Sequence, residues 1–430
     1  MSNQLFTNVS IFDGSGKKPF AGEVLVQGNR IKKVARGKTK IRRNGAKVID
    51  CGGATLLPGF VDCHAHLAYC DTATLFALGD IPPEENQLLA MHNAKLYMDH
   101  GITAAVSAAS SKPRTDIVLR NEINSGRIPG PRLRASTPQF VTTGGPWDAN
   151  QMHMEHGSFE IVADGPVEFR KKVREMIREG VDIVKLAISG DAFIEHTPEH
   201  AHSYSEDEIA AACEVAHSRG KRLAAHCRAD ASIRAAIKHG ITFIHHAEHA
   251  TTRTLDLLEK NKSKHYVCPA IGIIYATLYE GSDWGVDHEY AVAHRFDKTL
   301  QIAAKTTKEM FKRGIKVMPY GDYGFAWNPQ GTNNRDLEHF VNLIGFTPAQ
   351  TLMMATKWGG EAWAGSDPVE MGEVKEGYLA DLIVIDGDPI KDITLFQDAD
   401  NFLMVMKNGE YYKAPQRRRS GSRRQVVAAE

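Results

Sequence analysis

The middle of the chain, from about residue 57 to 362, alternates short apolar stretches with amphipathic ones. A short apolar run between turn residues is typical of a buried strand, whereas apolar residues spaced three and four apart predict a helix. Eight strand candidates occur, each followed by a helical pattern: LLPGFVDC, ITAAVSA, RLRAS, VDIVKLAI, RLAAHC, ITFIHH, HYVCP and IKVMPY. Eight such units in about 300 residues predict a (β/α)8 (TIM) barrel, with an open doubly wound sheet as the alternative.

Two of the helical patterns have clear boundaries. The first runs from Pro166 to Gly180, because proline suits the first position of a helix and glycine suits its exit. The second begins after Ser205, which has capping-box spacing to Glu208, and ends at Gly220. Both helices are expected to pack on the outside of the barrel.

The two ends of the chain share a different pattern. Near the start, apolar and polar residues alternate in GEVLVQGNRIKKV. Near the end, similar strand-like runs with glycine-containing turns occur in LADLIVIDGDP and NFLMVMKNGEYYK. We predict one small β-sandwich domain assembled from residues 1–57 and 363–413, beside a barrel of residues 58–362. Residues 414–430 are basic and polar, which predicts a disordered tail, with nucleic-acid or partner contact as the alternative.

The charge balance favours small-molecule chemistry. The chain has 52 Lys and Arg against 52 Asp and Glu, so no overall field favours nucleic acid or a membrane surface. No window reaches the ~20 apolar residues that span a bilayer, and the first residues lack a signal-peptide pattern. Six cysteines are scattered through the predicted core, which is typical of reduced thiols. We therefore expect a cytoplasmic protein with a small-molecule substrate.

Polar side chains stand at the ends of five predicted strands, where apolar residues would pack at lower cost. They are His64 and His66 on the first strand, Lys185 on the fourth, His226 on the fifth, His246 on the sixth and Asp322 on the eighth. Each alone has a structural explanation, such as a hydrogen-bonded core histidine, a surface lysine or a turn aspartate. Together they would meet at the carboxyl-terminal mouth of a barrel. Imidazole and carboxylate groups suit Zn²⁺, Mn²⁺, Co²⁺ or Ni²⁺, so the pattern predicts a metal site.

The motifs that carry these residues resemble the amidohydrolase superfamily. The matching stretches are PGFVDCHAHL, DIVKLAISGD, the two histidines twenty residues apart (246 − 226) and GD before a glycine-rich loop. GNRIKKV, EGYLADLIVIDGDP and VMKNGE resemble the β-sandwich that accompanies that barrel. TTGGP, VADGPVEFRKKVREMIREGVDIVKL and FTPAQTLMMAT are most similar to the imidazolonepropionase-related branch, which includes prolidase-like carboxypeptidases and ochratoxin amidases.

The resemblance implies two divalent metal ions, with zinc favoured and manganese, cobalt or nickel as alternatives. The more buried ion would take His64, His66, Asp322 and one oxygen of a carboxylated Lys185. The more exposed ion would take the other carbamate oxygen together with two ligands, His226 and His246. His245 competes with His246, but members of the superfamily place a non-ligand residue just before the ligand, which favours His246.

The resemblance also implies the reaction. A hydroxide bridging the two ions would attack the carbonyl of an amide C–N bond, and Asp322 would act as general base and then as general acid. The expected substrate is a dipeptide, an N-acyl amino acid or an aryl or heterocyclic amide. Hydrolysis of a cyclic amide, urea or carbamate is the alternative on the same fold, a deaminase is a weaker one, and a binding protein on a decayed barrel is a different class. Homo-oligomers are expected from the relatives.

Four residues are candidates for substrate contact. Arg228, two residues beyond His226, could pair with a substrate carboxylate, and an ion pair with Asp230 is the alternative. His249 could donate a hydrogen bond to substrate, or it could be structural. Tyr69 and Trp327 lie on predicted loops at the mouth, as do Trp147 and Phe325. These aromatic residues favour a ring-bearing substrate, although packing between loops explains them equally well.

Overall fold

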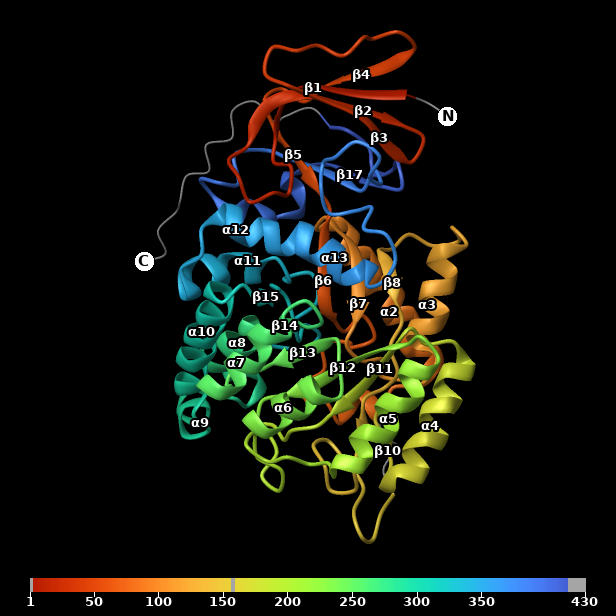
Figure 1. Ribbon diagram of the computed structural model, residues 1–430, viewed down its shortest axis with the longest axis vertical. Helices are drawn as coiled ribbons and strands as arrows, with labels where there is room; N and C mark the ends of the chain where they lie inside the picture. The colour runs from red at the N-terminus through yellow and green to blue at the C-terminus, as the bar shows by residue number, and fades with distance from the viewer. Residues whose placement is uncertain (1–2, 156–158, 417–430) are drawn as a thin grey trace.

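The computed structural model describes residues 3–155 and 159–416, so residues 417–430 of the predicted tail lie outside the described part. All eight predicted barrel strands are present (Figure 1). They are β6 (Phe60–Ala65), β7 (Ile102–Ser107), β8 (Arg132–Arg134), β11 (Ile183–Ala187), β12 (Arg222–Cys227), β13 (Phe243–His246), β14 (Tyr266–Cys268) and β15 (Lys316–Val317). Within this series β6, β7 and β8 pair in parallel, and so do β11 to β15.

The barrel closes around a packed interior. A parallel bridge from Ser136 to Ile183 joins the segment after β8 to β11. One buried cluster combines side chains from the first strand to the last, among them Val61, Phe243 and Met318. A barrel interior filled by apolar side chains is a core and not a pore. The predicted (β/α)8 fold is confirmed, and the open sheet is not what forms.

Helices follow the strands and cover the barrel. They are α1 (Ala77–Asp80), α2 (Pro83–Asp99), α3 (Thr115–Asn124), α4 (Gly165–Glu179), α5 (Glu206–Ser218), α6 (Asp230–Lys238), α7 (Thr252–Lys260), α8 (Ile271–Tyr279), α9 (His288–Ala293), α10 (Phe296–Lys312), α11 (Arg335–His339), α12 (Pro348–Met353) and α13 (Gly359–Ala364). The predicted boundaries hold closely: α4 ends before Gly180, which is left-handed at φ +108°, and α5 begins with the Ser205–Glu208 capping box. Among the described residues, no helix is long and apolar enough to cross a membrane.

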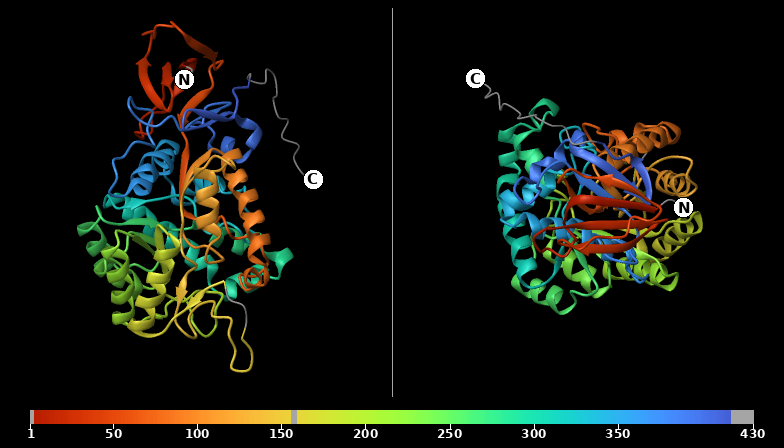
Figure 2. Two further views of the ribbon diagram at one scale, coloured as in Figure 1. Left: turned by 90° about the vertical axis from the view of Figure 1, so that its right-hand side faces the viewer. Right: turned by 90° about the horizontal axis from the view of Figure 1, so that it is seen from above.

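Strands from both ends of the chain join one sheet beside the barrel (Figure 2). They are β1 (Asn3–Ile11), β2 (Phe20–Gln27), β3 (Arg30–Arg36), β4 (Ala46–Asp50), β5 (Thr55–Pro58), β16 (Leu382–Ile385), β17 (Phe402–Lys407) and β18 (Glu410–Lys413). The two halves meet where β5 pairs antiparallel with β16. Because β6 begins directly after β5, the barrel strands start beside this sheet and their carboxyl ends lie at the opposite end of the barrel.

Two short strands were not predicted. β9 (Phe140–Val141) and β10 (Ile161–Val162) extend the sheet beside β11 after the third barrel strand. Two residues each are too few to show a hydrophobic period, so nothing in the local pattern distinguishes them from loop. The boundaries of the two predicted domains stay a prediction.

Candidate metal centre

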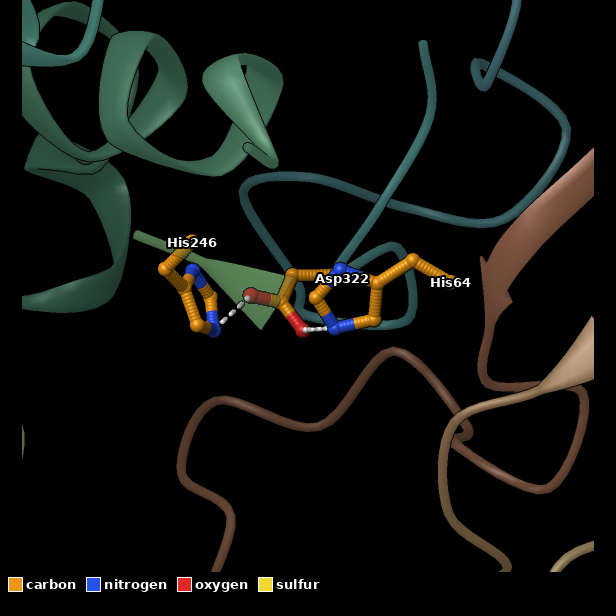
Figure 3. A group of neighbouring side chains, drawn as sticks. All are labelled: His64, His246 and Asp322. Carbon is orange, nitrogen blue, oxygen red and sulfur yellow. Dashed lines mark ion pairs between the residues drawn. The ribbon is translucent and has the colours of Figure 1, made fainter. Parts of the chain in front are cut away.

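Three histidines at the ends of two barrel strands surround the carboxylate of Asp322. Figure 3 shows two of them, His64 and His246, on either side of that carboxylate. Asp322 Oδ1 lies 3.1 Å from His64 Nε2 and 3.2 Å from His66 Nε2. Asp322 Oδ2 lies 3.4 Å from His246 Nε2. The ligand atoms of His64, His246 and Asp322 all lie within 4.8 Å of one another, which is close enough for one metal ion to contact all three. The resemblance assigned His246 to the second ion, and this division of the ligands between two ions stays a prediction.

Residues with left-handed backbone conformations direct the side chains of His246 and Asp322 toward the centre. On β13, Phe243 packs in the barrel interior and Ile244 against the helices, so simple alternation would send His245 and His246 to opposite sides. His246 has φ +69°, which breaks the alternation, and Asp322 has φ +56°. Such conformations cost about 1–3 kcal/mol for residues other than glycine and persist only where the surroundings hold them.

Gly321 makes room for the first of the histidines. Its φ is +146°, and a Cβ atom placed there would lie 2.7 Å from His64 Nδ1. That separation is shorter than real Cβ contacts allow, so a side chain at this position would push against the imidazole. Glycine immediately before Asp322 is therefore part of how the centre is built.

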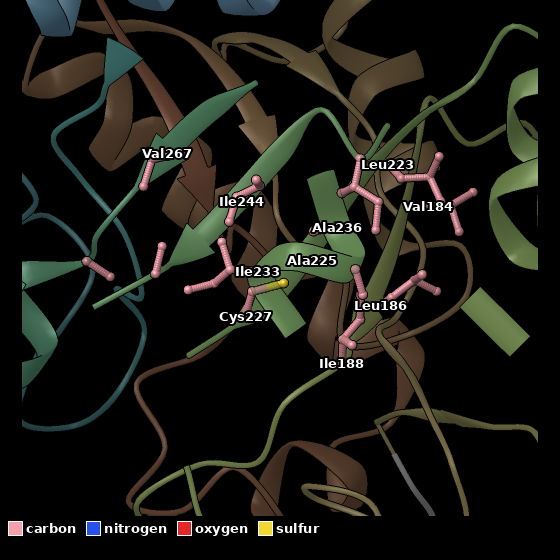
Figure 4. Close-up of a cluster of buried hydrophobic side chains, with 14 of the residues drawn as sticks. Val184, Leu186, Ile188, Leu223, Ala225, Cys227, Ile233, Ala236, Ile244 and Val267 are labelled. Carbon is pink, nitrogen blue, oxygen red and sulfur yellow. The ribbon is translucent and has the colours of Figure 1, made fainter. Parts of the chain in front are cut away.

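Lys185 points into the same region from the middle of β11. Its neighbours Val184 and Leu186 pack outward against the helices (Figure 4), and the alternation of the strand sends Lys185 inward. The side chain is 2% exposed, and Nζ lies 2.7 Å from His245 Nδ1. Burial lowers the pKa of Lys185 to about 8. His245, which was set aside as a ligand, stacks on His64 with ring centroids 3.7 Å apart.

His226 is beside the centre but turned partly away from it. Its ring meets that of His246 at a centroid distance of 4.4 Å. Its Nε2 atom lies 3.1 Å from the carbonyl oxygen of Gly190 and 3.6 Å from Asp191 Oδ2. The structure thus brings all six predicted ligands to one end of the barrel, with His226 facing the loop after β11.

The protonation states suit metal ligands. Burial lowers the pKa of His64 to about 4 and holds the pKa values of His226 and His246 well below the ordinary value, so these imidazoles are neutral. Burial alone would raise the pKa of Asp322, but His64 and His246 beside it keep that pKa well below its usual range. Within the described ranges, both ring nitrogens of His64 and Nδ1 of His246 are buried without a hydrogen-bond partner. Neutral imidazoles with unpaired nitrogens around a carboxylate fit a divalent transition metal.

A small cavity opens directly over the centre. Its described lining combines groups from the centre with an apolar wall: His66, Tyr69, Leu75, Gln139, Trp147, Lys185, Asp191, Phe193, His226, Arg228, Ile273, Asp322 and Phe325. The cavity therefore exposes both the reactive side chains and four aromatic rings to one ligand.

Arg228 lines the cavity with its charge already paired. Its Nε donates to Asp191 Oδ2 at 2.9 Å, and its Nη1 donates to Glu248. The alternative prediction, an ion pair between Arg228 and Asp230, is wrong. Asp230 begins α6 and pairs with Arg234 one turn later. The carboxylates that hold Arg228 come from loops after β11 and β13, which sequence proximity does not indicate.

The other substrate-contact candidates separate into two groups. Tyr69 lines the cavity and stacks on His66 with ring centroids 4.1 Å apart. Trp327 and His249 are not among the described lining residues. Trp327 packs behind Phe325 and donates to Thr277 Oγ1 at 3.0 Å, while His249 faces Glu199. The geometry gives no support for substrate contacts by these two residues.

Sequence reasoning missed Asp191 and Phe193 among the cavity residues, whereas Trp147 was expected on a loop near the mouth. Asp191 follows Lys185 by six positions (191 − 185), and SGD after that strand was its only local signal. Trp147 reaches the cavity with φ +66°, and Phe193 comes from the loop after β11. Nothing in their local patterns separates these aromatic residues from ordinary loop packing.

The barrel carries a candidate metal centre at the ends of its strands. Comparisons with known proteins point to a family of enzymes with this fold. Residues 55–411 match the Amidohydrolase family. Ochratoxinase of Aspergillus niger is 26% identical over 383 residues, which cover 84% of this chain and 76% of that protein. Imidazolonepropionase of Treponema denticola is 22% identical over 444 residues, with 94% and 97% covered. A solved Xaa-Pro dipeptidase with bound methionine in the active site is 24% identical, with TM-score 0.81 over 96% of this chain and 100% of that chain.

The chain belongs to the amidohydrolase family, as its motifs predicted. It is a hydrolase that acts on amide C–N bonds, built as a (β/α)8 barrel with a sheet domain from both termini. Members of this family generally bind divalent metal ions, and the histidine–aspartate group at Asp322 is the candidate site for them here.

Proposed function

We propose that this protein is a metal-dependent amidohydrolase that cleaves a dipeptide, an N-acyl amino acid or an aryl or heterocyclic amide. The observation that carries the proposal is the position of the Asp322 carboxylate, 3.1–3.4 Å from three imidazole nitrogens and exposed to the cavity that Lys185 also lines. The relatives named ochratoxinase and Xaa-Pro dipeptidase support amides of this kind. The small-molecule substrate, a homo-oligomer and a cytoplasmic location belong to the same proposal.

Six residues would hold two divalent cations. His64, His66 and Asp322 would hold one, His226 and His246 the other, and Lys185, carboxylated by CO₂, would bridge them. When bound, the cations would polarise the scissile carbonyl and lower the pKa of a water molecule, so that a nucleophile is available near neutral pH. Zinc suits neutral imidazole and carboxylate ligands, with manganese, cobalt or nickel as alternatives.

Asp322 would move the proton. An ionised carboxylate can accept a proton from the attacking water at one oxygen and deliver it to the departing amide nitrogen. The low pKa of Asp322 keeps it in the accepting form, and its side chain remains 15% exposed toward the cavity. A general acid–base group of this kind contributes about 10²–10⁴-fold to the rate.

The aromatic wall would bind the non-reacting part of the substrate. Tyr69, Trp147, Phe193 and Phe325 all line the cavity, so a ring-bearing group would bury apolar surface there and exclude water. Since Arg228 donates to two protein carboxylates, it supplies less free charge to a substrate carboxylate than an unpaired arginine would.

A substrate panel on the purified full chain tests the proposal. We expect hydrolysis of N-acyl amino acids, dipeptides or aryl amides, loss of that activity after a chelator, and recovery on adding back Zn²⁺, Mn²⁺ or Co²⁺. Aryl ureas and carbamates form the second arm of the panel. Faster turnover in that arm, or amide hydrolysis that survives complete metal removal, would contradict the proposal.

A further inference from the structure

A second cluster of metal-ligand side chains lies outside the centre at Asp322. Glu199 and His200 belong to the loop between β11 and α5, and His249 belongs to the loop between β13 and α7. Glu199 Oε1 lies 3.2 Å from His249 Nε2 and 3.4 Å from His200 Nε2. The two imidazole rings are 4.4 Å apart at their centroids. None of these residues takes part in the proposed hydrolysis.

The spacing fits shared coordination better than hydrogen bonding. Zinc–ligand distances of ~2.0–2.1 Å place tetrahedral ligands about 3.4 Å from one another, which matches both measured separations. A charge-assisted hydrogen bond would be shorter, about 2.7–2.9 Å. In the described part of the chain, His249 Nε2 and Glu199 Oε2 are buried polar atoms without a hydrogen-bond partner.

The buried side chains around Glu199 carry more negative than positive charge, which favours binding of a cation. Glu199 is 8% exposed, and next to it the buried Arg228 holds two further carboxylates, Asp191 and Glu248. Before the histidines are counted, this group of one guanidinium and three carboxylates has a formal charge of +1 − 3 = −2. Burial would lower the pKa of His249, but Glu199 and Glu248 beside it raise that pKa, as an excess of negative charge should. Buried charge without compensation is costly, and a divalent cation would bring the sum to zero.

We propose that Glu199, His200 and His249 form an additional Zn²⁺ site that joins the loop after β11 to the loop after β13. The same two loops carry Asp191 and Glu248, so a cation here would fix the frame that holds Arg228 in the cavity. Three protein ligands leave one position for water, as in zinc sites that exchange ligands. The side chain of His200 is 61% exposed, which gives the ion a route of entry.

Counting zinc sites on the full chain tests the proposal. The metal-stripped protein would be titrated with Zn²⁺ by calorimetry, and crystals would be measured at the zinc absorption edge. His200→Ala removes the exposed ligand with little risk to the fold. His196→Ala is the matched control, because His196 is an exposed histidine four residues away on the same loop.

We expect wild type and His196→Ala to bind one more equivalent of zinc than His200→Ala, with an anomalous peak between Glu199, His200 and His249. Saturating zinc should raise the melting temperature further in those two proteins than in His200→Ala, by about 3 °C. Equal stoichiometry in all three proteins, with no peak, would overturn the proposal and leave Glu199 and His249 as an ion pair. Lys185→Ala distinguishes this site from the catalytic one, since it should spare the additional equivalent whether or not it affects hydrolysis.

Discussion

Two buried polar groups lie side by side at the mouth of the barrel, and they differ in whether their atoms are already paired. Around Asp322, both ring nitrogens of His64 and Nδ1 of His246 have no hydrogen-bond partner among the described residues. Around Arg228, the guanidinium donates to Asp191 and to Glu248. Buried polar atoms without partners are costly, so the first group is built to receive a ligand and the second to hold the loops.

Replacing Asp322 should have the largest effect on activity. Asp322→Asn keeps the size of the side chain but removes the proton acceptor, so we expect kcat to fall about 10²–10⁴-fold. The melting temperature should change little, because the site is built for a ligand and not for stability. Asp256→Asn, on an exposed helix position, is the control. A kcat within threefold of wild type would remove Asp322 from the mechanism.

Replacing Arg228 should instead act on stability. Arg228→Met leaves two buried carboxylates without their partner, which costs about 3–5 kcal/mol. Arg234→Met is the matched control, since Arg234 forms a half-exposed pair one helical turn from Asp230 and should cost about 0–1 kcal/mol. Denaturant unfolding measures both. Equal midpoints for the two variants would show that the Arg228 pairs do not hold the loops.

Replacing Gly321 should lower both the stability of the protein and its metal binding. Gly321→Ala places a Cβ atom against His64 Nδ1 in a backbone conformation that alanine rarely adopts, at a cost of about 1–3 kcal/mol. We expect weaker metal retention together with the lower stability. Gly377→Ala is the control, because that glycine also has positive φ but has open space around it. If Gly321→Ala retained as much metal as wild type, the added Cβ atom would not be displacing His64.

The terminal sheet offers a pH test away from the site. Burial would raise the pKa of Glu23, but Arg43, the Ile41 N–H group and Lys40 outweigh it and lower that pKa to about 2. A lowered folded-state pKa stabilises the protein above the ordinary glutamate pKa, and this contribution is lost as pH falls toward 2. Glu23→Gln should cost about 1–2 kcal/mol at pH 7, less than the full shift implies, because the side chains of Arg43 and Lys40 are 45% and 65% exposed.

The stability difference between wild type and Glu23→Gln should shrink between pH 5 and pH 2, as chemical denaturation at each pH would show. A difference that stays constant over that range would mean that the charge of Glu23 contributes nothing. Glu23 lies on β2 of the terminal sheet, away from the centre at Asp322, so its replacement should leave substrate turnover unchanged.

The barrel and its strand-end residues could be predicted because their signals are local. Lys185 stands out in an apolar strand, and His64, His66, His226, His246 and Asp322 each end a stretch with strand character. Parallel strands in a barrel then bring these ends together. The positive φ of His246, which lets two adjacent histidines approach the centre, has no local signal.

The loop contacts could not be predicted, since they depend on how distant segments pack. Asp191 and Glu248 are 57 residues apart (248 − 191), and only the folded barrel places both beside Arg228. Trp327 looked like a cavity residue from its position after the eighth strand, yet its indole is used in packing with Phe325 and Thr277. Strand ends are positioned by the sheet, whereas loop residues are positioned by one another.

The most direct test of the central claim is the metal content of purified full-length protein, with hydrolysis of the best amide substrate followed in parallel. The His200→Ala background removes the additional zinc site from the count. We predict about two equivalents of divalent metal per chain in that background, and loss of both metal and activity when Lys185→Ala is added. A single equivalent, or activity that does not depend on Lys185, would contradict the two-cation centre.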